Sequence, residues 1–418
     1  MLSRLAQRLG FPSLGSHRRF VTAIAVDALG SGVFMPLSML YFLAVTPLTL
    51  LQVGAAVSIA SAVSLPAGPL IGALVDRLGA KQVLLAGNAL QALGFFAYLV
   101  TDSFAAVLLW TIVVTLGRTA FWGSYGNIVA AISAPGERER WFGFLGALRN
   151  VGFALGGLAS GVAITIGTDL AFATVVGVNA VSYLVAFWLL LTVPDARPGV
   201  HAALPGSWAT VLADRPYRLL MLAQVGYSMP MMILNFALPV YMVTVLDLPG
   251  WSTGVLFTIN CLMIGFGQGL VVNAMTGRVR YRILLLTQAV FAASYVVFLG
   301  ASALSVWVAT VVMIVGGMVY TLAELTGGPV LAALAAEAAP EHLRGRYLSL
   351  IQLAWNVSSA IAPVLFAWLL ARGPEPLWIV MLVLAAFFTA VSLRVGATMP
   401  QAAARVTNRA EVAVPTAD

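Results

Sequence analysis

The stretch GALVDRLGAKQVLL, Gly72 to Leu85, places an acid, two bases and two glycines within ten residues of an otherwise apolar sequence. A long run that is almost wholly apolar precedes it, and a second apolar run follows it. Gly79 permits a positive φ in a tight turn, and Arg77 and Lys81 would keep that turn on one side of a membrane. We therefore predict a short charged turn between two membrane-spanning helices.

The composition of the whole chain supports this interpretation. Of its 418 residues, 61% are hydrophobic and only 9% are charged, and the mean hydropathy is +0.97. Apolar runs recur that reach the roughly 20 residues a helix needs to cross a bilayer. The single cysteine, Cys261, lies inside one of these runs, which excludes a disulfide framework and a cysteine-rich metal site. We therefore predict an all-α, polytopic membrane protein.

The apolar runs fall into two similar sets. They predict about twelve transmembrane helices, arranged as two pseudo-symmetric six-helix bundles around a central cavity. The expected spans are residues 20–44, 51–75, 82–101, 104–132, 142–167, 170–193, 217–245, 252–275, 283–302, 304–335, 347–371 and 377–397. The longest polar break between them predicts a linker. The expected division is a basic N-terminal segment (1–19), a first bundle (20–193), a central linker (194–216), a second bundle (217–397) and a tail (398–418).

The basic residues lie in every second connection between the expected spans. The intervening connections near Thr46, Asp102, Gly167, Asp247 and Ser302 carry no Lys or Arg, and the one between the eleventh and twelfth expected spans carries only Arg372. Under the positive-inside rule, both termini and the linker are cytoplasmic in a plasma or inner membrane. The pI near 9.9 and the net charge of +7 therefore reflect topology and not a nucleic-acid partner. The first twenty residues either lie on the membrane surface as an amphipathic helix or form a disordered basic tail.

Two pairs of segments indicate an internal repeat. A shift of 200 residues lays the charged turn of 71–85 over 271–285, and a shift of 206 lays RERWFGFLGALRN (138–150) over RGRYLSLIQLAWN (344–356). Two matches at nearly the same offset favour duplication of a six-helix unit, the arrangement of parallel repeats in some transporters.

The charged turn also resembles a known signature. GALVDRLGAK is similar to the loop between the second and third spans of the major facilitator superfamily. Together with the twelve expected spans and the central linker, the resemblance covers residues 20–397. In that family the loop contributes to a charge lock between the two halves, a role that the resemblance gives to Asp76. The lock is one-sided here, because Asp76 aligns with Thr276. The alternative is a topogenic turn with a solvated Asp76. The expected cytoplasmic gate comprises Gly72, Asp76, Arg77, Gly79, Lys81, Arg140 and Arg346.

Three ionisable side chains lie deep inside expected spans: Asp27, Arg118 and Glu324. A charge at the bilayer centre costs about 2.5–3.5 kcal/mol, so each should face a partner or a wet cavity. Arg118 resembles the fourth-span arginine of the drug/proton antiporter branch, where an acid in the first span is common. We expect Arg118 to be the charge partner of Asp27. Glu324 and Asp27 are the proton-coupling candidates, with Glu324 preferred because its own half offers it no basic partner. The alternatives are a purely structural Asp27–Arg118 pair and a structural hydrogen bond of Glu324.

The expected cavity wall is bulky and mostly uncharged. Its members are Phe34, Met35, Phe121, Trp122, Tyr125, Tyr227, Asn235, Phe236, Gln352, Trp355 and Asn356. Aromatic and methionine surfaces adapt to varied apolar ligands. Taken alone, a residue of this kind more often packs in the core or faces lipid, and only the whole set favours a hydrophobic or amphiphilic substrate.

The fifth expected span carries closely spaced glycines. Gly152, Gly156, Gly157 and Gly161 follow a small-xxx-small pattern that allows helices to approach closely. The segment resembles the glycine-rich antiporter motif of the family but lacks its usual proline. Its expected packing partners are Gly265, Gly267 and Gly269 in the eighth span.

No nucleophile elbow, Walker loop, HExxH motif or Cys/His metal spacing is present. An enzyme, a cofactor, a bound metal and a nucleotide-driven pump are therefore not expected. The sequence predicts a secondary active transporter that works by alternating access and exports a lipophilic or amphiphilic small molecule, coupled to protons. Its expected partners are that molecule, the proton and the lipid bilayer, and we expect a monomer. The alternatives are an uptake symporter or facilitator for a small metabolite and a non-transporting membrane sensor.

Overall fold

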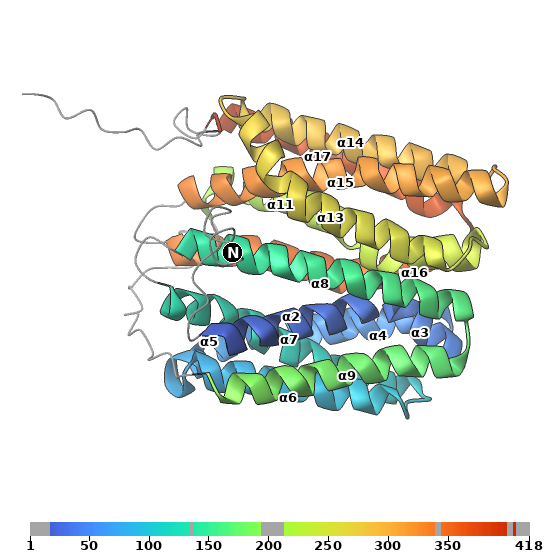
Figure 1. Ribbon diagram of the computed structural model, residues 1–418. Coiled ribbons are helices and arrows are strands. Elements are labelled where there is room, and N and C mark those ends of the chain that lie inside the picture. The colour runs from blue at the N-terminus through green and yellow to red at the C-terminus, as the bar shows by residue number, and fades with distance from the viewer. Residues whose placement is uncertain (1–16, 134–137, 194–212, 339–343, 399–403, 407–418) are drawn as a thin grey trace, which may run out of the picture.

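The computed structural model describes residues 17–133, 138–193, 213–338, 344–398 and 404–406 (Figure 1). The expectations for most of the N-terminal segment, of the central linker and of the tail lie outside the described residues. Within them the chain is helical, apart from one isolated antiparallel bridge between Val279 and Arg405.

The first half of the chain forms the elements α2 (Arg18–Phe34), η2 (Met35–Leu37), α3 (Ser38–Val45), α4 (Leu50–Val63), α5 (Ala67–Leu78), α6 (Ala80–Tyr98), α7 (Phe104–Ile132), α8 (Arg138–Ile166) and α9 (Asp169–Leu191). The second half forms α11 (Arg215–Met231), η3 (Ile233–Ala237), α12 (Leu238–Val240), η4 (Tyr241–Val245), α13 (Trp251–Met275), α14 (Arg280–Ala301), α15 (Val306–Glu337), α16 (Arg344–Leu370) and α17 (Glu375–Thr398).

The described helices account for the expected membrane spans. Ten of them are long and apolar enough to cross a bilayer, and α4 with α5, bent by 48° at their junction, makes an eleventh span. Helix α6 is shorter and carries Lys81, Asn88 and Gln91, so composition alone does not mark it as a span. It nevertheless packs between α7 and α9. It therefore completes the six-helix set of the first half.

The charged turn between α5 and α6 has the predicted geometry. Gly79 adopts φ +91°, and its amide donates to the Val75 carbonyl at 2.9 Å. In the second half Gly277 adopts φ +78°, and there Val406 and Ala404 pair with the turn through backbone hydrogen bonds. We call the end of the bundle that holds these two turns the basic end, and the other the opposite end.

The two halves meet along α8 and α13, and the contact is tightest towards the opposite end. A Cβ on Gly254 would lie 2.4 Å from the Gly157 carbonyl oxygen and 2.7 Å from the Gly161 Cα. Only glycine permits backbones to approach this closely. The close-packing role predicted for the glycines of α8 is confirmed, but their main partner on α13 is Gly254 and not the predicted stripe from Gly265.

The same two helices separate towards the basic end. One face of α8 passes from Gly157 through Asn150, which is 3.3 Å from a Cβ built on Gly265, to Gly146, which has no atom within 4 Å of its Cβ position. The matching position on α13, Gly269, is also open. Figure 1 shows α8 and α13 close together at the right and diverging towards the left.

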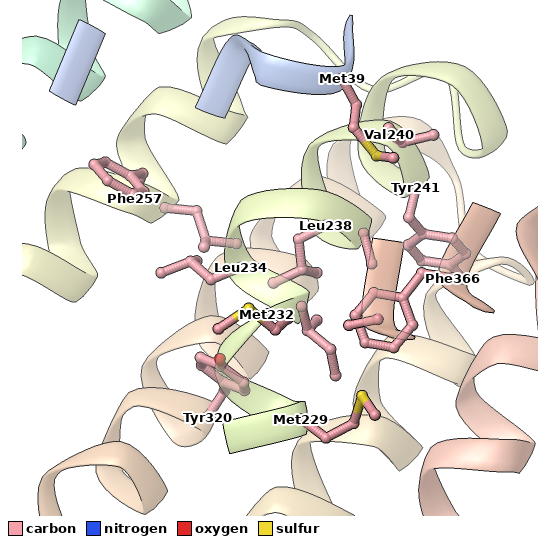
Figure 2. Packing of buried hydrophobic residues seen from close by; sticks show 14 of the residues in the cluster. Met39, Met229, Met232, Leu234, Leu238, Val240, Tyr241, Phe257, Tyr320 and Phe366 are labelled. Atoms are coloured by element: carbon pink, nitrogen blue, oxygen red, sulfur yellow. The ribbon is translucent and has the colours of Figure 1, made fainter. Parts of the chain in front are cut away.

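Two further contacts join the halves near the opposite end. A Cβ on Gly54 of α4 would lie 2.7 Å from both the Pro363 carbonyl oxygen and the Ala367 Cβ of α16. Figure 2 shows the apolar core around η3 and α12, where Met39 of the first half lies beside Val240 of the second. This core belongs to a buried cluster that spans both halves. The opposite end is therefore sealed by packed side chains.

Prolines inside helices free backbone carbonyls, and neighbouring helices supply the missing donors. Pro230 and Pro329 cannot bond to the carbonyls four residues earlier. The Gly226 carbonyl accepts from Gln288 at 3.2 Å, and the Leu325 carbonyl accepts from Gln268 at 3.1 Å. The carbonyls that these two prolines leave free are therefore hydrogen-bonded by neighbouring helices.

We predict that Gly254→Val destabilises the protein, because its side chain would collide with the backbone of α8. Overpacking of this kind costs about 1–3 kcal/mol, so the thermal unfolding midpoint of the purified protein in detergent should fall. Gly269→Val on the same helix is the matched control and should leave the midpoint near that of the parent. Equal midpoints for the two variants would contradict the close contact.

Cysteine labelling should distinguish the two ends. Cys261 is buried, so a Cys261→Ser background removes a site that already reacts poorly. In that background Gly146→Cys should react rapidly with a water-soluble maleimide. Ser58→Cys should react slowly, because Ser58 is buried and accepts a hydrogen bond from the Val364 amide at 3.0 Å. Fast reaction at both positions would show that the opposite end is not sealed.

Candidate functional site

Asp27 forms a buried ion pair inside the first half. Its Oδ2 accepts a hydrogen bond from Arg149 Nη1 at 2.7 Å, and the residues are 3% and 7% exposed. Asp27 lies on α2 and Arg149 on α8, which pack against each other. The close approach is possible because Gly152 and Gly156 of α8 touch the backbone of α2.

Aromatic rings cover the guanidinium of Arg149. Its Cζ lies 4.7 Å from the ring centroid of Trp122, 5.3 Å from that of Phe121 and 5.1 Å from that of Phe153. Tyr125 stacks on Phe121 at 5.7 Å between centroids. The structure therefore brings three predicted cavity residues, Phe121, Trp122 and Tyr125, together around a charge.

The expected pairing of Asp27 with Arg118 is wrong. Arg118 is exposed, and no ion pair within the described part of the chain joins it to Asp27. Among the described residues Asp27 takes its ion pair from Arg149 instead. The physical reason is the glycine-mediated contact of α8 with α2, which places an arginine of the fifth span nearer than one of the fourth.

Sequence reasoning missed Arg149, although a signal for it exists. The arginine stands immediately before the glycine stripe of α8, well inside that helix and far from either of its ends. A charged side chain in that position is as costly to place in a membrane as those of Asp27, Arg118 and Glu324, which the sequence analysis selected for this reason. Phe153, one turn further along α8, gave no signal that separates it from ordinary packing residues.

Glu324 lies in a different environment in the second half. It is 3% exposed on α15, and its Oε2 accepts a hydrogen bond from Asn260 Nδ2 of α13. Asn260 also donates to Thr321 Oγ1 at 3.0 Å. Glu324 Oε1 has no hydrogen-bond partner within the part of the chain that the structure describes, and no basic side chain there pairs with the carboxyl group.

Tyrosines surround the Glu324 segment. The Tyr227 hydroxyl donates to the Glu324 backbone carbonyl at 3.0 Å, and the Tyr320 hydroxyl donates to the Pro230 carbonyl at 2.8 Å. Tyr320 also lies within reach of the Glu324 side chain. Tyr227, a predicted cavity residue, therefore supports the backbone beside the carboxyl group.

The remaining predicted cavity residues lie on α2, η2, η3 and α16. Phe34 packs in an aromatic cluster with Phe95, at 4.7 Å between centroids, and Met35 is half-buried beside it. Asn235 lies where the halves meet, and its backbone carbonyl accepts from Ser38 at 3.4 Å.

On η3, Phe236 is half-buried. On α16, Gln352 is exposed and donates to Asn356 Oδ1 at 3.3 Å, and Trp355 is half-buried.

The predicted gate residues lie at the basic end. Asp76 and Arg77 are exposed, and Asp76 has no hydrogen bond or ion pair with the residues that the structure describes. Lys81 donates to the Leu191 carbonyl at 3.0 Å. Gly72 faces open space at its Cβ position. The side chains of Arg140 and Arg346 lie outside the described residues, so the charge lock stays a prediction.

Two packed halves that meet at one end and separate at the other, with ionisable groups buried in each, define a polytopic membrane transport protein. The chain belongs to the Major Facilitator Superfamily, whose family model matches residues 20–363. It is accordingly a multi-pass membrane protein and a secondary transporter, not an enzyme.

Curated relatives are drug-resistance proteins by name. The chain is 30% identical over 236 residues to Multidrug resistance protein MdtH of Cronobacter sakazakii, a match that spans 54% of this chain and only 56% of that protein. It is 26% identical to MdtH of Photorhabdus laumondii over 86% of this chain and 88% of the relative. It is 25% identical to Tetracycline resistance protein, class D, of Salmonella ordonez over 80% and 85%.

Solved structures share the fold at low identity. A bacterial homologue of the iron transporter ferroportin in an inward-facing state superposes with a TM-score of 0.73 at 16% identity, covering 92% of this chain and 99% of that one. The inward-open xylose transporter XylE from E. coli gives a TM-score of 0.72 at 14% identity, covering 92% and 96%. These likenesses confirm the predicted all-helical fold.

We predict that Asp27→Asn destabilises the protein strongly, since it strands the buried charge of Arg149. Breaking a buried pair by removing one partner costs about 3–5 kcal/mol. The double variant Asp27→Asn/Arg149→Gln should recover much of the loss, because it leaves no unpaired charge. Thermal unfolding in detergent measures both, with Arg372→Gln, an arginine outside the pair, as the control. A double variant no more stable than Asp27→Asn would contradict the coupling.

Proposed function

We propose that the protein exports lipophilic or amphiphilic small molecules from the cell in exchange for protons. The observation that carries the coupling step is the buried carboxyl group of Glu324, which has no basic partner among the described residues. The names of the relatives, multidrug and tetracycline resistance proteins, support export as the direction and a drug-like molecule as the substrate.

The surroundings of Glu324 suit reversible protonation. An ionised carboxylate buried without a counter-charge is costly, and among the residues that the structure describes Asn260 is the one hydrogen-bond donor to the Glu324 oxygens. Because the Tyr320 hydroxyl gives its proton to the Pro230 carbonyl, its oxygen is free to accept one. A proton on Glu324 Oε1 would therefore fit this site. Loss of that proton would leave a buried charge and so favour entry of water or rearrangement of the helices.

Asp27 is the second candidate for proton coupling, but its situation differs. Arg149 already neutralises it at 2.7 Å. In this proposal Asp27 takes part in substrate binding, and Glu324 takes up and releases the proton. The two sites lie in different halves, so movement of the halves against each other would link them.

The orientation follows from the distribution of basic residues. We propose that the basic end faces the cytoplasm, as the positive-inside rule implies. The open face of α8 at Gly146 would then admit substrate from the cytoplasm, and the packed core at Met39 and Val240 would close the outer side. The state described here would be the inward-facing one of an alternating-access cycle.

One proton moving inward supplies enough driving force. It yields about 2.3 kcal/mol at a potential of about 100 mV. Since each 1.4 kcal/mol corresponds to about a tenfold ratio, one proton sustains roughly a 50-fold gradient of a neutral substrate. A single titrating carboxyl group therefore suffices.

We predict that Glu324→Gln binds substrate but loses proton-driven accumulation in inverted membrane vesicles, because an amide cannot take up and release the proton. A panel of lipophilic fluorescent compounds in vesicles energised by respiration measures this. Glu375→Gln, an exposed acid at the start of α17, is the matched control and should transport normally.

Normal accumulation by Glu324→Gln, with the pH dependence of transport lost in Asp27→Asn instead, would reverse the two roles. Accumulation by the parent protein only in right-side-out vesicles would replace export with uptake. No accumulation in either orientation would contradict transport of these compounds altogether.

A further inference from the structure

Helix α13 lies between the contact of the two halves and the buried carboxyl group of Glu324. It packs against α8 of the first half and against α15, the helix that carries Glu324 (Figure 1). Thr258 contacts α8, whereas Asn260 contacts α15. Two positions along an α-helix are separated by about 200° around its axis, so these side chains leave α13 on opposite sides. One short segment of α13 therefore reaches both places.

On the α8 side, a side-chain hydrogen bond crosses between the halves. The Thr258 hydroxyl donates to the Ala154 carbonyl of α8 at 2.9 Å, and Thr258 is 8% exposed. The ring of the neighbouring Phe257 packs where Gly157 lacks a side chain, since a Cβ there would lie 2.6 Å from that ring. Rotation of α13 about its axis would therefore break this hydrogen bond and displace Phe257 from Gly157.

On the α15 side, both N–H groups of the Asn260 amide are used. Nδ2 donates to Glu324 Oε2, and it also donates to Thr321 Oγ1 at 3.0 Å. The Thr321 hydroxyl gives its own proton to the Gly317 carbonyl at 2.7 Å, so its oxygen serves Asn260 as an acceptor. The amide is therefore held in one orientation, with its NH₂ group towards α15.

The strength of the bond between Asn260 and Glu324 depends on the charge of the carboxyl group. A hydrogen bond to an ionised carboxylate is shorter than one between neutral groups and roughly twice as strong. Loss of the proton from Glu324 would draw Asn260 towards α15, and uptake of a proton would release it. Because Asn260 belongs to α13, the position of this helix would change with the charge.

The other titratable groups near Glu324 are neutral at neutral pH. They come from every helix packed around it in the second half: Tyr227 of α11, Cys261 of α13, Tyr295 of α14 and Tyr320 of α15 itself. No Lys or Arg of the described chain forms an ion pair with the carboxyl group. Glu324 is therefore the group of this cluster whose charge changes.

We propose that Asn260 and Thr258 of α13 transmit the protonation state of Glu324 to the contact between the two halves. This inference rests on the proposed proton coupling at Glu324 and adds the residues through which that coupling acts. Asn260 is a positioning residue, because it does not carry the proton but pulls on α13 with a strength set by it. Thr258 converts the movement of α13 into a change at α8.

The described arrangement fits the protonated form of Glu324. Its Oε1 is buried and has no hydrogen-bond partner within the described residues. Low pH should therefore favour this arrangement, in which α8 and α13 separate towards the basic end. High pH should ionise Glu324, pull Asn260 towards α15 and weaken the Thr258 contact. The population should then shift towards a state in which Gly146 and Gly269 lie closer together.

The distance between the open ends of α8 and α13 tests the proposal. Spin labels are attached at Gly146→Cys and Gly269→Cys in the purified full-length protein in detergent, without substrate or proton gradient. Cys261 stays in place, because it is buried and adjacent to Asn260. Between about pH 5 and about pH 8, the ratio of open to closed molecules should fall about 5- to 150-fold, the usual range for coupling between two sites. Glu324→Gln should show no such change.

Thr258→Val tests the transmission without touching the proton site. It removes the hydroxyl that reaches α8 and keeps the shape of the side chain. The change in the open-to-closed ratio should be smaller by about fivefold, the effect of one hydrogen bond. Thr258→Ser retains the hydroxyl and should respond as the parent does. Asn260→Leu removes the donor to Glu324 and should lose the response to pH.

Two buried residues of the same types are matched controls. Thr310 donates to the Val306 carbonyl and Asn88 to the Leu84 carbonyl, each within its own helix. Thr310→Val and Asn88→Leu should keep the full response of the parent.

Three results would overturn the proposal: a parent that does not respond to pH, a full response in Thr258→Val or in a folded Asn260→Leu, or an equal loss in the control variants. If Asn260→Leu does not fold, the comparison of Thr258→Val with Thr258→Ser decides the question.

These outcomes are separable from those of the proposed function. A response that persists in Glu324→Gln would remove Glu324 as the proton site. A response that is lost in Glu324→Gln but complete in Thr258→Val would keep the proton site and remove only the path through α13.

Discussion

The contact between α8 and α13 is the constraint on which the rest of the structure depends. Gly157 and Gly161 meet Gly254 backbone to backbone, so the two halves are held together near one end by surfaces with no side chain to rearrange. Further along the same face, Asn150 still touches α13 and Gly146 no longer does. This contact resembles a hinge: the two halves are packed together at the opposite end and can separate at the basic end.

The same helix carries the charged site of the first half. Gly152 and Gly156 bring α8 against α2, and Arg149 extends from that contact to Asp27. One helix therefore joins the interface between the halves, the buried ion pair and the aromatic rings above it. Any change in the angle of α8 would alter all three together, so α8 is the element through which the proposed coupling of substrate binding to opening of the bundle would act.

The two halves treat buried charge in different ways. The first half compensates Asp27 with a guanidinium at 2.7 Å, and the second half gives Glu324 an amide and tyrosine hydroxyls nearby but no cation among the described residues. The positive charge of a neighbouring arginine favours the ionised form of a carboxyl group. A buried carboxyl group without such a neighbour is more stable when it takes up a proton. The proposed division between a substrate site at Asp27 and a proton site at Glu324 is based on this difference.

The sequence by itself determined the fold class, because about twenty consecutive apolar residues have few alternatives to a membrane-spanning helix. It also determined the turn at Gly79, where the positive φ of 91° excludes most other residues, and it identified Glu324 and Asp27 as buried charges because charge in an apolar run is costly anywhere along the chain. These are local properties, readable from neighbours in the sequence.

Only the tertiary structure decided which charges meet. Asp27 lies 91 positions from Arg118 and 122 from Arg149, and nothing in either spacing distinguishes the two arginines. The selection of Arg149 depends on how closely α8 approaches α2, and the choice of Gly254 over Gly265 as the tightest partner depends on where two helices cross. Helix crossing points are set by the packing of all neighbouring surfaces at once, and that information is not contained in any single stretch of the chain.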